Sequence, residues 1–270
     1  MNQLNHRDGR REEILRALEM QQRVHVSRLA QRFGVSPVTI RGDLRVLEQA
    51  GLVQRQHGGA TTTRGAPSGL PLDEKRSQYR ERKHSIAARA MQLVRPGDKL
   101  ILDAGSTTLQ LAILLARTAA LPDAPLPLSV FTNSLPIANE LGSVQDIELL
   151  LSGGTLRKAS QSLQGPQAEA GLEDYVFDKL FLGVDGCDPA FGLSTHDEAE
   201  ARLNARMAAQ ARQVIVLADS SKFGRICLHR ICDVNRVDIV VSDAALPSDM
   251  REALSQRGVE VLIAEATDNA

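Results

Sequence analysis

The segment DAGSTT, which begins at Asp103, carries the residue types that bind an anion. An apolar stretch ends at this aspartate, Gly105 permits a tight turn, and three hydroxyl residues then open a helical pattern, namely Ser106, Thr107 and Thr108. Backbone N–H groups at a helix N-terminus, together with hydroxyls, hold a phosphate without requiring a cation. Capping by serine or threonine produces the same pattern. The segment by itself indicates either a phosphate site or a helix cap.

Small polar or acidic residues end other apolar stretches in the same way. Ligands of open α/β sheets bind at the carboxyl ends of the strands, so several such ends predict one shared polar site. Asp185 suits sugar hydroxyls or a turn cap, and Lys222 suits an anionic ligand or an ordinary surface position. The candidate effector-binding residues are Asp103, Gly105, Ser106, Thr107, Thr108, Thr132, Asn133, Gly153, Gly154, Asp185 and Lys222.

Seven apolar stretches must position these residues. They are KLILDAG, LSVFTNS, IELLLSGG, KLFLGVDG, VIVLADSS, VDIVVSDA and VEVLIAEA. Helical patterns lie between most of them, for example at 107–118, 197–212 and 247–257. Continuous apolar strands that alternate with helices indicate an α/β domain with a doubly wound, mostly parallel sheet.

A different pattern precedes these strands, in SRLAQRFGVSPVTIRGDLRVLEQAG. Its periodicity predicts a helix near 26–33, a turn at Gly34 and a second helix near 37–50, which Ser36 caps and Pro37 begins. Apolar residues of the second helix recur at i, i+4 and i+7, so they form one buried face: Ile40, Leu44 and Leu47. A further helix is expected near 8–21.

The other face of that second helix is small, polar and cationic, as a reader of the DNA major groove requires. The following LVQRQHGGATTTR predicts a β-hairpin that turns at Gly58-Gly59, so this part is a winged helix-turn-helix. The wing offers cations to phosphate or to the minor groove. The candidate DNA-binding residues are Ser27, Ser36, Pro37, Thr39, Arg41, Gly42, Arg45, Arg55 and His57.

Charge is divided unequally along the 270 residues. Residues 1–65 hold 11 basic and 6 acidic side chains, whereas the remaining residues hold 21 and 27. The small N-terminal part is therefore the one that suits a polyanion. The sequence shows no apolar run long enough to span a membrane and no secretory signal, and its three cysteines lack a framework spacing. We expect a cytoplasmic protein with reduced thiols.

Other chemistries find little support. The motifs GxxxxGK[ST], GxGxxG, HExxH, GxSxG and CxxC are absent, so nucleotide binding and common hydrolytic mechanisms are not indicated. Cys227, His229 and Cys232 have the right types for zinc but lack an evident fourth ligand, and a lone His196 before a helix is usually structural. We expect no metal and no cofactor.

The sequence resembles the DeoR family of bacterial repressors over nearly its whole length. VSRLAQRFGVSPVTIRGDLRVLEQAGLVQRQHGGA resembles the family's DNA-binding part, and DAGSTT, FTNS, LSGG, FDKLFLGVDG and ADSSKFGR resemble its sensor domain. GVDGCDPAFGLSTHDEAEARLN and DSSKFGRICLHRI are most similar to repressors of N-acetylgalactosamine and galactosamine utilisation. Many members have two arginines before the aspartate of the second helix, where this chain has Arg41-Gly42.

This resemblance implies a repressor of a sugar catabolic operon, an amino-sugar operon in particular, that a phosphorylated sugar releases from operator DNA. It also implies a sensor domain similar to ribose-5-phosphate isomerase. An isomerase fused to a DNA-binding module is therefore the rival interpretation. Those enzymes have a lysine after DGxD, whereas this chain has FGLST at 191–195. The cation that would stabilise the negative charge of the isomerase reaction is thus missing, which counts against this rival. Activation of transcription remains a further alternative.

The domain limits expected from these patterns are residues 1–65 for the winged helix-turn-helix, 66–98 for a linker and connecting helix, and 99–270 for the sensor domain. The connecting segment includes a basic helix near 74–94 that either contacts DNA or presents a solvated face. Operators are usually repeats, so we expect a homo-oligomer.

Overall fold

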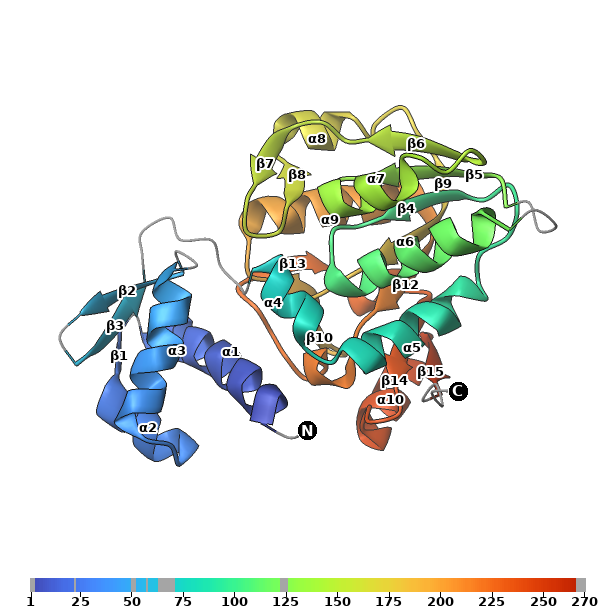
Figure 1. The fold of residues 1–270 in the computed structure, drawn as a ribbon. Helices are drawn as coiled ribbons and strands as arrows, with labels where there is room; N and C mark the ends of the chain where they lie inside the picture. The colour runs from blue at the N-terminus through green and yellow to red at the C-terminus, as the bar shows by residue number, and fades with distance from the viewer. Residues whose placement is uncertain are drawn as a thin grey trace. The chain divides into compact units, whose positions relative to one another are not determined.

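The chain forms two compact units, residues 1–78 and 79–270 (Figure 1). A computed structural model describes residues 3–21, 23–49, 52–56, 58–62, 71–121 and 126–265. No helix within these ranges is both long and apolar enough to cross a membrane.

The first unit is a winged helix-turn-helix. Its elements are α1 (Gln3–Gln21), β1 (Arg23–His25), α2 (Val26–Phe33), α3 (Pro37–Gln49), β2 (Val53–Gln56), β3 (Gly59–Thr62) and α4 (Leu72–Ser77). Helices α1, α2 and α3 enclose a core in which Ile14, Leu18 and Leu29 meet the predicted inner face of α3. Ile40, Leu44 and Leu47 are indeed buried there, so the predicted phase of α3 is confirmed.

The wing has a third strand that the sequence patterns did not predict. The three strands lie in the order β1-β3-β2 and are antiparallel. Gly58 adopts a φ of +78° in the turn, and a Cβ on Gly59 would lie 1.9 Å from the carbonyl oxygen of Val24. The two glycines therefore serve different needs, since the first makes the turn and the second lets β1 approach β3.

The single basic helix expected near 74–94 is wrong, because the structure has two helices there. The short α4 ends at Ser77, and α5 spans Arg80–Met91. Tyr79 between them has a φ of +50°, a left-handed conformation that no continuous α-helix contains. The second helix packs against α6 (Ser106–Ala119), which places it within the second unit.

The second unit is built on a seven-stranded parallel sheet, as the alternating pattern predicted. Its order is β15-β14-β12-β9-β4-β5-β6. The strands are β4 (Lys99–Leu102), β5 (Leu128–Thr132), β6 (Ile147–Leu151), β9 (Phe177–Leu182), β12 (Ala211–Leu217), β14 (Ile239–Asp243) and β15 (Glu260–Ala264). Every pairing between them is parallel.

Helices cover both faces of this sheet (Figure 1). Strand residues alternate between two cores: Leu100 and Leu102 pack with α5, α6 and α7 (Leu135–Leu141), whereas Ile101 packs with α8 (Pro166–Ala170) and α9 (Glu198–Gln210). Residues of α10 (Ser248–Ser255) join the second of these cores. The reversal of strand order between β4 and β9 puts the crossover helices on opposite faces.

Two small antiparallel sheets, absent from the sequence-based prediction, extend from the main sheet. One pairs β7 (Thr155–Arg157) with β8 (Ser162–Gln164). The other has the order β10-β11-β13, formed by Gly186–Asp188, Gly192–Thr195 and His229–Cys232. The short helices η1 (Ser220–Lys222) and η2 (Val234–Arg236) lie before and after β13 in the sequence. These additions follow strands β6, β9 and β12, so they bring further side chains to the carboxyl ends of the sheet.

Candidate nucleic-acid interface and effector site

Helix α3 begins with a capped first turn. The N–H of Thr39 donates to the hydroxyl of Ser36 at 3.1 Å, and the hydroxyls of the two residues lie 2.9 Å apart. This is the N-cap geometry that the sequence predicted for Ser36. The Thr39 hydroxyl is thus engaged within the helix, whereas Ser27 and Pro37 are exposed.

The outer face of α3 presents two arginines and, between them in sequence, a glycine. Arg41 and Arg45 are exposed, and neither forms an ion pair with another residue of the described part of the chain. Gly42 lies between them in sequence, and a Cβ added there would meet nothing within 4 Å. This face therefore combines uncompensated positive charge with close access to the helix backbone.

Two other cations of the first unit are paired with carboxylates. Arg32 donates to Glu13 at 2.9 Å, and the Arg55 guanidinium lies 3.6 Å from Glu48. Arg55, a predicted wing contact, thus has a carboxylate partner, which reduces its pull on a phosphate. His57, the other wing candidate, lies outside the described residues.

Arg28 is a candidate that the sequence reasoning missed. It lies in the first turn of α2, is exposed, and has no carboxylate partner within the described ranges. In helix-turn-helix proteins the first helix crosses the DNA backbone, which gives an exposed cation there a phosphate to contact. In the sequence, only its position next to the candidate Ser27 points to DNA contact. Arg28 becomes a candidate once the structure shows which arginines of the first unit are paired with carboxylates.

Asp43 is a second residue whose role the sequence did not show. It is buried on the inner side of α3 and accepts hydrogen bonds from the Nε atoms of Arg10 and Arg11 of α1, at 2.6 and 3.2 Å. Arg11 also lies 3.5 Å from Glu74 of α4. These ion pairs join α3 to α1 and α4.

In the second unit, the order of the sheet reverses between β4 and β9. From β4 the chain proceeds to β5 and β6 on one side, and from β9 it proceeds to β12, β14 and β15 on the other. Open α/β sheets bind ligands at such a switch point, outside the carboxyl ends of the strands. The segments that leave these two ends contain Asp103 and Asp185, which the sequence had already selected.

The two strand ends are joined directly. Oδ2 of Asp103 accepts a hydrogen bond from the N–H of Gly183 at 3.3 Å, and Asp103 is 1% exposed. A Cβ on Gly183 would lie 3.8 Å from the Cα of Gly105, so the two loops pass close to each other. The buried carboxylate of Asp103 therefore fixes the spacing of the loops on either side of the switch point.

The segment after Gly105 opens α6, a helix of 14 residues. Thr108 donates its hydroxyl to the carbonyl oxygen of Gly105 at 2.9 Å. The hydroxyls of Ser106 and Thr107 form no hydrogen bond with the rest of the described chain, and both residues are largely buried. These two hydroxyls and the first N–H groups of α6 are the groups available to an anion.

Thr132 and Asn133 support this loop. The Thr132 hydroxyl donates to the carbonyl oxygen of Leu102 at 2.7 Å. Oδ1 of Asn133 accepts from the N–H of Ala104 at 3.0 Å, and its Nδ2 donates to the carbonyl oxygen of Leu163 at 3.3 Å. Both side chains are buried and engaged in positioning the loop.

Gly153 and Gly154 form the turn that leads to β7. Their φ values are +69° and +104°, and a Cβ on Gly154 would lie 2.7 Å from the carbonyl oxygen of Gln164. The turn delivers Arg157, another residue the sequence reasoning missed. Its Nε lies 3.4 Å from Asp197, the residue that caps α9.

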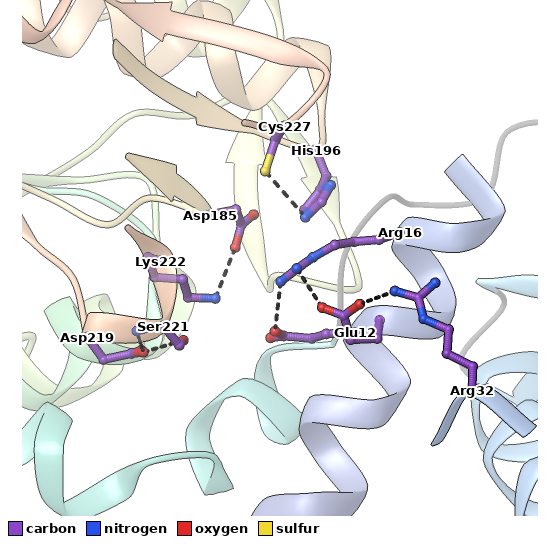
Figure 2. A network of polar contacts seen from close by, with 10 residues as sticks. Glu12, Arg16, Arg32, Asp185, His196, Asp219, Ser221, Lys222 and Cys227 are labelled. Atoms are coloured by element: carbon purple, nitrogen blue, oxygen red, sulfur yellow. Dashed lines mark hydrogen bonds and ion pairs between the residues drawn. The ribbon is translucent and has the colours of Figure 1, made fainter. Parts of the chain in front are cut away.

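A chain of polar contacts starts at Lys222. Its Nζ points toward Asp185 (Figure 2) and lies 3.8 Å from Oδ1, with both side chains mostly buried. The other oxygen of Asp185 lies 3.2 Å from the Thr195 hydroxyl, which is 2.8 Å from Oε1 of Glu200. Glu200 in turn lies 3.9 Å from the guanidinium of Arg157. Two cations and two carboxylates are thus held at the carboxyl end of β9.

Helix α5 reaches the same end of the sheet. The guanidinium of Arg82 donates to the Ser220 hydroxyl at 3.0 Å and lies 3.7 Å from Asp243. Asp243 also accepts from the N–H of Ser220 at 2.7 Å. Helix α5 thus contacts Ser220, which lies two residues before Lys222 in the sequence.

Cys187, Cys227 and Cys232 are free thiols. Sγ of Cys227 lies 3.6 Å from Nε2 of His196 (Figure 2), and no group of three or more candidate ligands occurs in the described ranges. Burial raises the pKa of Cys187 to about 12 and that of Cys232 to about 11. Both thiols are therefore protonated and unreactive near neutral pH.

Comparison with known proteins assigns both units. Residues 10–64 match the DeoR-like helix-turn-helix domain, and residues 78–244 match the DeoR C terminal sensor domain. The chain belongs to the DeoR family. A candidate aga operon transcriptional repressor of Escherichia coli O157:H7 is 43% identical over 94% of the chain and 93% of its own length.

Two other relatives of this DeoR-family chain are also regulators. The transcriptional regulator GlpR of Haloferax volcanii is 37% identical over 88% of the chain and 90% of its own length. The glycerol-3-phosphate regulon repressor of Escherichia coli K12 is 28% identical, over 92% and 95%. The expected family is thereby confirmed, and the chain is a transcriptional regulator rather than an enzyme.

Similarity to solved structures is weaker. Ribose 5-phosphate isomerase A of Methanocaldococcus jannaschii gives a TM-score of 0.37 at 19% identity, with 52% of the chain and 53% of the enzyme covered. eIF2B beta of Chaetomium thermophilum gives 0.39 at 12% identity, with 80% and 59% covered. Neither likeness bears on function.

Proposed function

We propose that this DeoR-family regulator represses an operon for amino-sugar catabolism, and that a phosphorylated sugar relieves the repression. It acts in the cytoplasm as a homo-oligomer that spans a repeated operator. The name of the relative from Escherichia coli O157:H7, which refers to an aga operon, supports the choice of operon.

The observation that carries DNA binding is the contrast between paired and unpaired cations. Arg32 and Arg55 are matched by carboxylates, whereas Arg41 and Arg45 on the outer face of α3 have no partner within the described ranges. A cation that lacks a protein partner gains most from a phosphate or a guanine edge. Arg28 adds a phosphate contact from α2.

For the effector, we propose that the phosphate binds the N-terminus of α6. The hydroxyls of Ser106 and Thr107 and the first backbone N–H groups of the helix hold its oxygens. Lys222 and Asp185 then face the sugar, since both side chains meet at the end of β9. Thr132, Asn133 and the Gly153-Gly154 turn position these groups.

Effector binding changes operator affinity only if it favours one conformation over another. A coupling of about 1–3 kcal/mol is typical, which corresponds to a change in affinity of about 5- to 150-fold. Arg82 connects the effector end of the sheet to α5, and Tyr79 separates α5 from α4. This segment is the covalent route by which the second unit acts on the first.

The test is displacement of the full-length protein from DNA upstream of its own gene. Fluorescence anisotropy at one fixed salt concentration would follow release by amino-sugar phosphates, other sugar phosphates and the matching unphosphorylated sugars. Only the phosphorylated sugars should release the protein from the DNA. Thr107→Ala should blunt the release and leave operator affinity intact.

Thr118→Ala, at the opposite end of α6, is the matched control and should respond as the unmodified protein does. Release by unphosphorylated sugars, or an unaltered response in Thr107→Ala, would refute the phosphate site.

A further inference from the structure

Val38 is an apolar residue that stands largely exposed on the surface of α3. It lies in the first turn of α3, and 72% of its surface is accessible. In the same helix Ile40, Leu44 and Leu47 are fully buried and Val46 is half-buried, so α3 has the core contacts it needs without Val38.

The position of Val38 on the helix is specific. An α-helix has 3.6 residues per turn, so residues spaced i, i+4 and i+7 form one row. Val38, Gly42 and Arg45 have this spacing and are all exposed. The row faces away from Ile40 and Leu44. Along this row the exposed side chain of Val38 is followed one turn later by Gly42, which has no side chain, and then by the cation of Arg45.

This row matches the major groove of DNA. The only apolar group on the base edges in that groove is the 5-methyl of thymine, and a small apolar side chain is its usual contact. The uncompensated charges of Arg41 and Arg45 bring the row to the duplex. Because Gly42 has no side chain and a Cβ there would meet nothing within 4 Å, the DNA can approach the backbone at the middle of the row.

We propose that Val38 packs against a thymine methyl in each operator half-site, and that Gly42 provides the clearance for this contact. Val38 is thereby a specificity-determining residue that distinguishes T·A from the other base pairs at one position. This inference rests on the proposed operator binding through α3.

The experiment replaces each thymine of the footprinted operator, one at a time, by deoxyuridine. This change removes only the 5-methyl and preserves base pairing. Operator affinity of the full-length protein should fall about fourfold at one thymine per half-site, the effect of one lost apolar group, and should be unchanged at thymines outside the contact.

Val38→Ala should bind the unmodified operator more weakly by a similar factor and should no longer respond to that deoxyuridine. Val176→Ala is the matched control, because this valine of the second unit is 61% exposed and is not part of α3. It should bind both duplexes as the unmodified protein does.

Gly42→Ala tests the clearance separately. The added methyl meets no protein atom, and alanine favours a helix more than glycine does, so the thermal stability should be kept or raised. Operator affinity should nevertheless fall at least tenfold. Unchanged affinity would show that the DNA does not approach the backbone at this turn.

Two outcomes separate the failure of this inference from the failure of the proposed function. Tight operator binding that is insensitive to deoxyuridine at every position would refute thymine reading by Val38 and leave operator binding standing. Absence of any footprint on the upstream DNA would refute both.

Discussion

Removal of the charge on Asp43 should destabilise the DNA-binding unit severely. The carboxylate is only 5% exposed and is held between Arg10 and Arg11, whose side chains are 9% and 17% exposed. Asp43→Asn keeps the shape but leaves Arg10 buried without a counter-charge. Breaking a buried pair from one side costs about 3–5 kcal/mol.

The lower part of that range applies here. Arg11 is the more exposed arginine and keeps Glu74 at 3.5 Å, so its charge remains partly compensated. We expect a loss of about 3 kcal/mol. A unit of this size changes its melting temperature by about 4–8 °C for each kcal/mol, which gives a decrease of roughly 15 °C.

Glu48→Gln is the matched control, since it also removes one carboxylate from α3. Glu48 and Arg55 are both exposed and lie 3.6 Å apart, so that pair should contribute less than about 1 kcal/mol. The two variants differ mainly in the burial of the charge they remove.

Hydrogen exchange of the full chain, read on peptides from α3, would measure the stability of this unit without separating it from the sensor domain. Asp43→Asn should lose protection in α1 and α3, and operator binding with it, while peptides from the parallel sheet keep theirs. Equal protection in the Asp43 and Glu48 variants would refute the assignment of a buried, stabilising charge cluster.

Three further predictions concern single side chains. Arg41→Ala should weaken operator binding about tenfold or more at unchanged melting temperature, whereas Arg32→Ala, whose charge Glu13 already compensates, should bind DNA nearly normally in the same anisotropy titration. Asn204→Leu should raise the free energy of unfolding, measured in urea, by about 1–3 kcal/mol, because Oδ1 and Nδ2 of Asn204 are buried and form no hydrogen bond with the described chain. Asn133→Leu is the control and should lower the free energy of unfolding, because both amide atoms of Asn133 are hydrogen-bonded. A loss of stability in both variants would refute the view that the Asn204 amide is unsatisfied. Burial raises the pKa of Cys187 from 9.0 to about 12, so the unfolded chain ionises first and stability should fall as pH rises from about 9 toward 12. At pH 10 this thiol should account for about 1.4 kcal/mol of the loss, and urea titrations at pH 7 and 10 should show a smaller decline in Cys187→Ala than in the unmodified chain.

Local pattern was enough to predict the main elements of this protein. The i, i+4, i+7 spacing of Ile40, Leu44 and Leu47 determines which side of α3 is buried, because each turn of a helix repeats every 3.6 residues. Continuous apolar strands between helices likewise determine a parallel sheet, since crossover helices must cover both of its faces. The hydroxyl-rich start of α6 was also visible in the order of residues 103–108.

Tertiary structure decided which of these groups remain available. Arg55 and Arg41 look alike in sequence, but of the two only Arg55 lies beside a carboxylate in the described chain. Thr132 likewise looks like a ligand contact in sequence, but its hydroxyl donates to the carbonyl oxygen of Leu102. Asp103 and Asp185 come to one place because β9 inserts beside β4 rather than beyond β6, and Asp43 meets two arginines from another helix. Periodicity reports which face of an element is buried, whereas the partner that a polar group meets depends on how distant segments cross, which no local spacing records.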